Sequence, residues 1–381
     1  MQKITRLAVA VATALATAAV GAPAASAAYG GVGHPRGGDH AVFVQNDNPA
    51  GNQVIAYRRA DDGHLTPAGT YDTHGLGGVL AGSVADHLAS QGSLTYDPRH
   101  ALLYAVNAGS DTVSVFSVDG DRLALRQVVG SGGRFPVSVA VHNNVVYVLN
   151  ALDGGSIQGY TVRDGRLHKE AGRNRCLGLD PNATPQFTTT PGQVGFTGEG
   201  SQLVVTTKAN SNSLLVFNLD RSGAPADTPV TTLLPGAVPF AFVPNGRHGL
   251  FLTEAGTNAV ATFTIHPDGT ATQEAFAATN QAATCWIVAV HDLLYTSNAG
   301  SSTLTGFRTA DRGRRLTALG NTPTDPGTVD AAVSSDRHYL YAQTGVHGIL
   351  DEFAVNDDGS LTPLGSQTVP DGAGGEGIVA F

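Results

Sequence analysis

The chain has 381 residues, of which 31 are acidic and 22 basic, so its formal net charge is -9. An acidic surface argues against nucleic acid or an anionic membrane as the partner. The 48 glycines, the low share of charged residues (14%) and the lack of long helical periodicity predict many short strands joined by tight turns.

The first 27 residues have the pattern of a secretory signal peptide. Lys3 and Arg6 precede an apolar run, and small residues at positions 25–27 form a cleavage site. The apolar run is too short to span a bilayer, and no later stretch reaches the necessary length. We therefore expect a secreted, extracellular protein without a membrane anchor. Residues 28–40 are expected to form a glycine-rich arm, and residues 41–381 a single folded domain.

A recurring pair of large apolar residues, here called anchors, organises the rest of the sequence. In the clearest copy, Tyr104 and Phe116 lie on two alternating strands around the polar loop Asn-Ala-Gly-Ser-Asp. Seven copies of the pair occur, and a recurrence of this length predicts a repeat architecture. The pairs are Phe43 with Tyr57, Tyr104 with Phe116, Tyr147 with Tyr160, Val204 with Phe217, Phe251 with Phe263, Tyr295 with Phe307, and Tyr341 with Phe353.

An additional apolar segment precedes the first anchor in every copy except the first. The chain ends with such a segment, residues 377–381, and no further copy follows it. We predict that this segment becomes the innermost strand of the first copy, whose own strands are expected at residues 41–45, 53–58 and 65–70. The predicted fold is all-β: a seven-bladed β-propeller closed by pairing of the N- and C-terminal strands, which leaves no open sheet edge inside the ring.

Cys176 and Cys285 are the only cysteines in the chain. An even number in an exported chain favours one disulfide between them, which would draw the long link of residues 172–192 across the channel mouth. Two buried free thiols are the alternative.

One face of the predicted ring gathers the links between blades and the loops between second and third strands. Two links are unusually long, residues 71–92 and 172–192, and long irregular loops are more often functional than idle. No histidine spacing typical of a metal site occurs, so we expect no cofactor and no metal. The candidate binding residues on this face are Asp47, His74, His87, Asn107, Asn150, Lys208, Glu254, Asn298, Asp330 and Glu376.

The repeats, such as residues 103–107, and the Asp-Gly-Ser-Leu of residues 358–361 resemble the lactonase-type seven-bladed propellers. This family includes bacterial 6-phosphogluconolactonase and the fungal 3-carboxymuconate lactonizing enzyme. The resemblance covers residues 41–381 and implies a Pro-His step at the start of a middle inner strand, then an acidic residue on the next strand. Here Gly192 follows Pro191, and Thr207 or Lys208 replaces the acid. No catalytic residue is assigned, because glycine cannot act as a base.

These observations favour a binding or interaction module over an enzyme, with a secreted lactonase as the alternative. The layout also resembles secreted proteins of the dispase autolysis-inducing type, which implies an extracellular protein partner such as a protease. Gln45 and Gln53 are then candidate cross-linking sites for a transglutaminase, or ordinary surface glutamines. We expect the protein to be a monomer.

Overall fold

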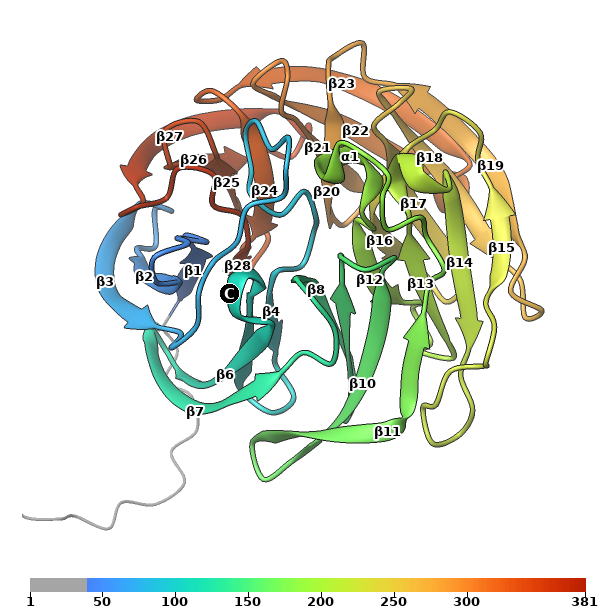
Figure 1. Ribbon diagram of the computed structural model, residues 1–381. Coiled ribbons are helices and arrows are strands. Elements are labelled where there is room, and N and C mark those ends of the chain that lie inside the picture. Colours follow the sequence, from blue (N-terminus) through green and yellow to red (C-terminus); the bar gives the residue numbers. More distant parts are fainter. Residues whose placement is uncertain (1–39) are drawn as a thin grey trace, which may run out of the picture. The chain divides into compact units, whose positions relative to one another are not determined.

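Seven four-stranded antiparallel sheets make up residues 40–381, the part of the chain that the computed structural model describes. The predicted signal peptide and nearly all of the predicted arm lie outside the described residues. Innermost strands of neighbouring sheets contact one another all around the ring (Figure 1). The seven-bladed propeller predicted from the anchor pairs is therefore confirmed.

From the innermost strand outward, blade 1 consists of β28 (Ile378–Ala380), β1 (Ala41–Gln45), β2 (Gln53–Arg59) and β3 (Leu65–Asp72). Blade 2 consists of β4 (Leu94–Asp97), β5 (Leu102–Asn107), β6 (Thr112–Asp119) and β7 (Arg122–Gly130). Blade 3 consists of β8 (Pro136–His142), β9 (Val145–Asn150), β10 (Ser156–Arg163) and β11 (Arg166–Cys176). Blade 4 consists of β12 (Gln193–Phe196), β13 (Gln202–Thr206), β14 (Ser213–Asn218) and β15 (Val230–Leu233).

Blade 5 consists of β16 (Pro239–Asn245), β17 (Gly249–Glu254), β18 (Ala259–Ile265) and β19 (Ala271–Ala278). Blade 6 consists of β20 (Thr284–Val290), β21 (Leu293–Asn298), β22 (Thr303–Ala310) and β23 (Arg315–Pro323). Blade 7 consists of β24 (Thr328–Val333), β25 (Tyr339–Thr344), β26 (Ile349–Val355) and β27 (Leu361–Thr368). The helices are the short α1 (Gln186–Thr189) and the 3-10 turns η1 (Ala108–Ser110), η2 (Lys208–Asn210) and η3 (Asp311–Gly313). Within residues 40–381, none is long and apolar enough to cross a membrane.

The anchor residues form the packing between blades. In every blade the first anchor lies on the second strand and the second anchor on the third, and all of these side chains are buried. A buried tyrosine hydroxyl needs a hydrogen-bond partner, and three anchors find it in a turn of the next blade. Tyr147, Tyr295 and Tyr341 donate to the carbonyl oxygens of Gly223, Gly359 and Gly63 at 2.7, 2.9 and 2.7 Å.

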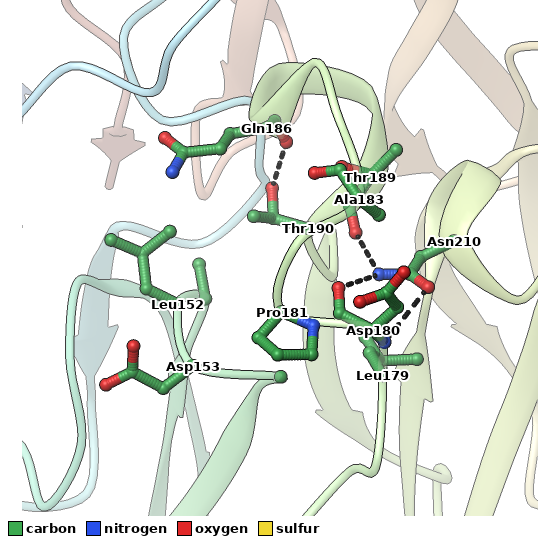
Figure 2. Close-up of a pocket in the computed structure, with 12 residues that line it drawn as sticks. Leu152, Asp153, Leu179, Asp180, Pro181, Ala183, Gln186, Thr189, Thr190 and Asn210 are labelled. Carbon is green, nitrogen blue, oxygen red and sulfur yellow. Dashed lines mark hydrogen bonds between the residues drawn. The ribbon is translucent and has the colours of Figure 1, made fainter.

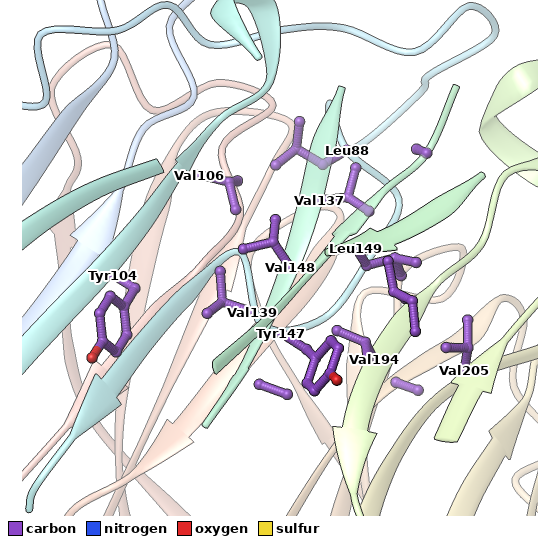
Figure 3. Close-up of a cluster of buried hydrophobic side chains, with 14 of the residues drawn as sticks. Leu88, Tyr104, Val106, Val137, Val139, Tyr147, Val148, Leu149, Val194 and Val205 are labelled. Atoms are coloured by element: carbon purple, nitrogen blue, oxygen red, sulfur yellow. The ribbon is translucent and has the colours of Figure 1, made fainter. Parts of the chain in front are cut away.

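The largest hydrophobic cluster runs through several adjacent blades. Figure 3 shows Tyr104 of blade 2, Tyr147 of blade 3 and Val205 of blade 4 within it. Leu88 belongs to the same cluster although it lies in the link of residues 71–92 rather than in a strand. The part of this link around Leu88 therefore belongs to the core.

The ring closes at blade 1, where the last strand of the chain pairs with the first. Val44 lies opposite Ile378, and Val42 lies opposite Ala380. The ring of Phe381 stacks on Tyr96 of blade 2, with the ring centres 4.6 Å apart. The predicted closure by the C-terminal segment is confirmed.

The predicted disulfide is wrong, because Cys176 and Cys285 are both free thiols. The outer strand β11 extends as far as Cys176, which is exposed and lies opposite Ser156 in the sheet of blade 3. Cys285 is buried on the innermost strand of blade 6. The sequence argument placed Cys176 in the link of residues 172–192, whereas the strand holds it at the outer edge of its blade.

Deleting residues 377–381 should strongly destabilise the protein. The deletion removes the pairing of β28 with β1 and the burial of Ile378, which together correspond to a loss on the order of 5 kcal/mol, or about 10 °C in melting temperature. Thermal unfolding followed by circular dichroism measures this change. Since Glu376 is retained, the loss reports the strand itself. A truncated protein that melts within a degree or two of the full chain would contradict the closure.

Candidate functional site

The link of residues 71–92 crosses one mouth of the channel. After β3 it turns inward, and Leu80, Leu88, Ala89 and Ser90 are at most 1% exposed. We call its innermost part, residues 86–91, the axial segment. A segment without secondary structure is stable in such a place only if its backbone groups find partners.

Innermost strands on two sides of the channel supply some of these partners. The Ser90 hydroxyl donates to the carbonyl oxygen of Val137 in blade 3 at 2.8 Å. In blade 6, the indole N–H of Trp286 donates to the carbonyl oxygen of Ser90, and the backbone N–H of Ile287 donates to Oε1 of Gln91 at 2.9 Å. The axial segment therefore spans the channel and ties opposite blades together.

Lys208 of blade 4 supplies a third attachment. Its Nζ donates to the carbonyl oxygens of Ala89 and Phe187 at 2.7 and 2.8 Å, and to Oγ1 of Thr190 at 3.1 Å. The ammonium also lies 5.5 Å from the ring centre of Phe240, a cation–π distance. Burial lowers the pKa of Lys208 to about 8. The three donor positions of the ammonium are all used to hold the two long links.

Glu376, two residues before the closing strand β28, supplies a fourth attachment. The backbone N–H of Ser90 donates to its carboxylate at 3.3 Å, and the Ser90 hydroxyl, which has one hydrogen to donate, lies between this carboxylate and the carbonyl oxygen of Val137. The backbone N–H of Glu376 donates to Oδ2 of Asp47 at 2.9 Å. Asp86, within the axial segment, accepts the backbone N–H of Ala89 at 2.8 Å.

Asp47, Asp86, Asp330 and Glu376 form a buried carboxyl cluster next to the axial segment. Burial raises the pKa of Asp47 and of Asp330 to about 7. Burial, together with the Asp86 carboxylate, raises the pKa of Glu376 well above its ordinary value. Burial also raises the pKa of Asp86, whose Oδ1 has no hydrogen-bond partner among the described residues. At neutral pH the cluster therefore carries less negative charge than four free carboxylates.

Cys285 lies close enough for its thiol to be affected by this cluster. Burial raises the pKa of Cys285 strongly, and the charges of Asp86, Lys208 and Glu376 also act on it. A thiol of raised pKa is a poor nucleophile at neutral pH. Among the described residues, no three His, Cys, Asp or Glu side chains are arranged to hold a metal ion.

The structure brings together Asp47, Lys208, Asp330 and Glu376 of the predicted binding residues. His87 lies at the edge of the cluster, where its Nδ1 is 3.3 Å from the carbonyl oxygen of Asp47. Glu254 is buried at the end of β17, and its carboxylate accepts a hydrogen bond from Thr257 at 2.9 Å. His74 is exposed on the link of residues 71–92.

The three predicted asparagines brace loops instead of lining the cluster. Asn107 and Asn298 each end a second strand and donate to a hydroxyl on the third, Ser114 at 2.9 Å and Thr305 at 2.8 Å. Asn150 donates to the carbonyl oxygen of Ser131 at 3.3 Å. The buried amides of Asn107 and Asn298 are fully used by the fold, whereas Oδ1 of Asn150 has no hydrogen-bond partner among the described residues.

Gln45 cannot be a cross-linking site in this conformation, because it is fully buried and its amide donates to Asp47 and to the carbonyl oxygen of Val106. The prediction is wrong because all five residues of β1 are buried, so both faces of this strand are covered by other parts of the protein. The sequence of the strand alone does not show this. Gln53 is partly exposed at the start of β2, so its role as an acyl donor stays a prediction.

Sequence reasoning missed Asp86, Ser90 and Trp286. Asp86 has no distinguishing signal in the sequence, because it stands beside His87 on an extended link. The apolar pair Leu88 and Ala89, which follows at once, is the signal that this link turns into the core.

Gly192 occupies the position at which the family resemblance implied a histidine. A Cβ atom at Gly192 would lie 2.5 Å from the carbonyl oxygen of Phe240 and 3.1 Å from Oγ1 of Thr206. These contacts leave no room for a side chain without movement of the β16 backbone. The strand β12 is thus packed against its neighbour at the place where a base is expected.

A small cavity lies beside this position, under the second long link. It is lined by Leu152, Asp180, Gln186, Thr190 and Asn210 among others, and Asn210 bonds to the link at Asp180 (Figure 2). Its volume of about 20 Å³ is enough for one water molecule and too small for a lactone.

Comparison with known proteins agrees with this fold. The model of the family described as Lactonase, 7-bladed beta-propeller matches residues 80–375, which is more than half of the chain. The chain belongs to this family. No curated protein matches it significantly.

Several solved structures resemble the chain over 90% of its length. A Bacteroides fragilis protein provisionally assigned as a 6-phosphogluconolactonase has a TM-score of 0.71 and 17% identity, with 98% of that chain covered. The periplasmic gluconolactonase PpgL of Pseudomonas aeruginosa has a TM-score of 0.69 and 16% identity, also with 98% covered. Apo AztD of Citrobacter koseri has a TM-score of 0.58 and 13% identity, again with 98% covered. At such identities the likeness shows the fold alone.

The carboxyl cluster predicts a pH dependence of stability. A buried carboxyl group whose pKa is about 7 in the folded protein, against an ordinary value of 3.8, contributes stability below pH 4, and this contribution is lost as the pH rises through 7. Asparagine does not ionise, so the Asp330→Asn variant should not lose this stability as the pH rises. Its melting temperature should therefore fall less between pH 5 and pH 8 than that of the unchanged protein. Calorimetry at both pH values measures the difference.

Asp357→Asn is the matched control, because Asp357 is exposed on a turn of blade 7. It should retain the full dependence on pH, to which Asp351, with a pKa raised by burial to about 7, also contributes. An Asp330→Asn variant with the same pH dependence as the control would show that Asp330 is ionised in the folded protein.

Proposed function

We propose that this chain is an exported binding protein of the lactonase-type propeller family, in which the mouth that carries the candidate site is closed by the chain itself. The observation that carries the proposal is the axial segment, which is held across the channel by Lys208, Trp286 and Glu376. A substrate could reach the carboxyl cluster from this mouth only if residues 86–91 moved. The hydrogen bonds from Lys208 and Trp286 to this segment, and those between Ser90 and Glu376, would have to break first.

The same face offers a surface for a protein partner. Leu76, Val79 and Val84 project from the link of residues 71–92 with exposed fractions of 43%, 48% and 86%, and Val346 of blade 7 is 44% exposed. Ala85 packs against Gly345 in the loop that also contains Val346, so the link and this loop are in contact. Exposed apolar side chains that gather on one face are typical of protein interaction sites.

A lactonase is the second candidate function. Family membership and the raised pKa values of Asp47 and Asp330 favour it, because perturbed carboxyl groups gather at catalytic sites. In this interpretation the axial segment is a lid that opens for the substrate. Activity measurements separate the two candidates.

The protein should hydrolyse 6-phosphogluconolactone and gluconolactone no faster than buffer does. Gly192 offers no base, and loss of a positioned base typically costs a factor of about 10² to 10⁴. Proton release measured at several protein concentrations tests this. A rate that rises with protein concentration and falls in His74→Ala, His87→Ala or Glu254→Gln would establish the lactonase and overturn the proposal.

The tagged protein should retain a secreted protein from culture medium, and a protease is the partner expected from the sequence. Val79→Ser, Val84→Ser and Val346→Ser together should reduce the retained amount several-fold, because each removes exposed apolar area. The control is Leu125→Ser with Val128→Ser on the outer strand β7, where both side chains are 38% exposed. Equal losses in the two variants, or no retained protein, would refute binding through this face.

A further inference from the structure

The opposite mouth of the channel is open. Successive turns of an antiparallel sheet alternate between its two ends, so the turns between first and second strands lie away from the axial segment. Two adjoining cavities occur there, of about 300 and 480 Å³, and they share His142 and Phe196. Each is within the size range of small-molecule sites. We call the two together the basin.

The smaller cavity of the basin is mainly apolar and lies at the axis. It is lined by the innermost strands β4, β8, β12 and β16, with Val139, Val141, Phe196 and Phe242 among its walls. Gly195 lies between these side chains and contributes no bulk of its own. A planar hydrocarbon group would lose apolar contact with water on entering this part.

The larger cavity adds cationic groups. Arg99 stands in the turn between β4 and β5, and Arg221 in the loop between β14 and β15. Neither forms an ion pair with any residue of the described chain, and the guanidinium of Arg99 bonds only to the amide oxygen of Asn143, at 3.2 Å. Such guanidinium groups can receive a carboxylate in a bidentate manner.

Both carboxylates in the wall of the larger cavity are already engaged. The carboxylate of Glu199 accepts hydrogen bonds from the guanidinium of Arg247 and from the hydroxyl of Ser201, both at 2.8 Å. Asp220 accepts the backbone N–H groups of Ser222 and Ala224 at 2.8 and 3.0 Å. Glu199 is paired with Arg247, whereas Asp220 keeps its charge, so Arg99 and Arg221 outnumber the one unpaired carboxylate in this wall. The net charge that faces the basin is therefore positive, in a protein whose net charge is -9.

We propose that the basin binds a small amphipathic carboxylate, with its planar apolar body against Phe196 in the smaller cavity and its carboxylate between Arg99 and Arg221. His142, which belongs to both cavities, lies beside the ring of Phe196 at 5.5 Å and contacts the ligand where body and carboxylate meet. This site is separate from the axial segment and does not depend on the function proposed for the other face.

Benzoate is the probe, because it combines a planar ring with one carboxylate. Isothermal titration of the full chain should give a dissociation constant on the order of 1 mM. Arg99→Gln with Arg221→Gln should weaken binding by about tenfold or more, since a charge-assisted hydrogen bond is lost at each position. Benzamide, the neutral analogue, should bind at least about tenfold more weakly than benzoate.

Arg122→Gln with Arg126→Gln is the matched control. Both arginines lie on the outer strand β7, so these substitutions remove the same charge from a part of the protein outside the basin. This control should bind benzoate as the unchanged protein does, and thermal melting should show that both double variants are folded. Three results would overturn the proposal: no heat of binding up to about 20 mM benzoate, equal affinity for benzamide, or equal losses in the two double variants.

Discussion

The pairing of β28 with β1 is the constraint on which the rest of the structure depends. Three residue pairs join the two ends of the chain, and without them the innermost position of blade 1 is empty. The same pairing fixes the residues just before β28. The backbone N–H of His87 donates to the carbonyl oxygen of Gly374 at 2.7 Å, and the backbone N–H of Ser90 donates to the carboxylate of Glu376. Closure of the ring and closure of the mouth are thus one event, because the segment that completes blade 1 also holds the axial segment.

The buried charges show why the axial segment stays in place at neutral pH. Four buried carboxyl groups and one buried ammonium would together carry a large net negative charge if all were ionised, and burial of unpaired charge is costly. Burial raises the pKa of Glu376, Asp47 and Asp330, which lowers this negative charge at neutral pH. The ammonium of Lys208 bonds to uncharged oxygens rather than to a carboxylate, so it holds backbone more than it neutralises charge.

The fold could be predicted from the sequence because the signal is periodic and local. Each anchor pair, such as Tyr104 and Phe116, lies on adjacent strands of one blade, so spacing alone places both residues. The terminal strand could be predicted because the apolar segment of residues 377–381 is not followed by a further anchor pair, while the first copy lacks such a segment. The site could be predicted only in part. Contacts such as Lys208 with Ala89, or Glu376 with Ser90, join residues far apart in the chain, and no spacing encodes them.

The errors have the same origin. Cys176 falls within the predicted link of residues 172–192, whereas the strand β11 extends as far as Cys176, which pairs with Ser156. The sequence predicts that Gln45 lies at the surface, whereas Gln343 of blade 7 and Val106 of blade 2 form hydrogen bonds with it from both sides. Local composition carries information about a residue's own strand. The strand position of Cys176 and the burial of Gln45 depend instead on the neighbouring strand or blade.

The difference between the two mouths follows from the lengths of the connections. On the closed face, the link of residues 71–92 is far longer than is needed to join β3 to β4, so surplus chain is available to fold inward and fill the axis. On the open face, first and second strands are joined by short turns, such as residues 143–144 between β8 and β9. A turn of this length cannot reach the axis, because an extended residue spans at most about 3.6 Å. The basin is therefore a consequence of the repeat itself, whereas the axial segment is an addition to one connection, which is why a change in that link can close one mouth without affecting the other.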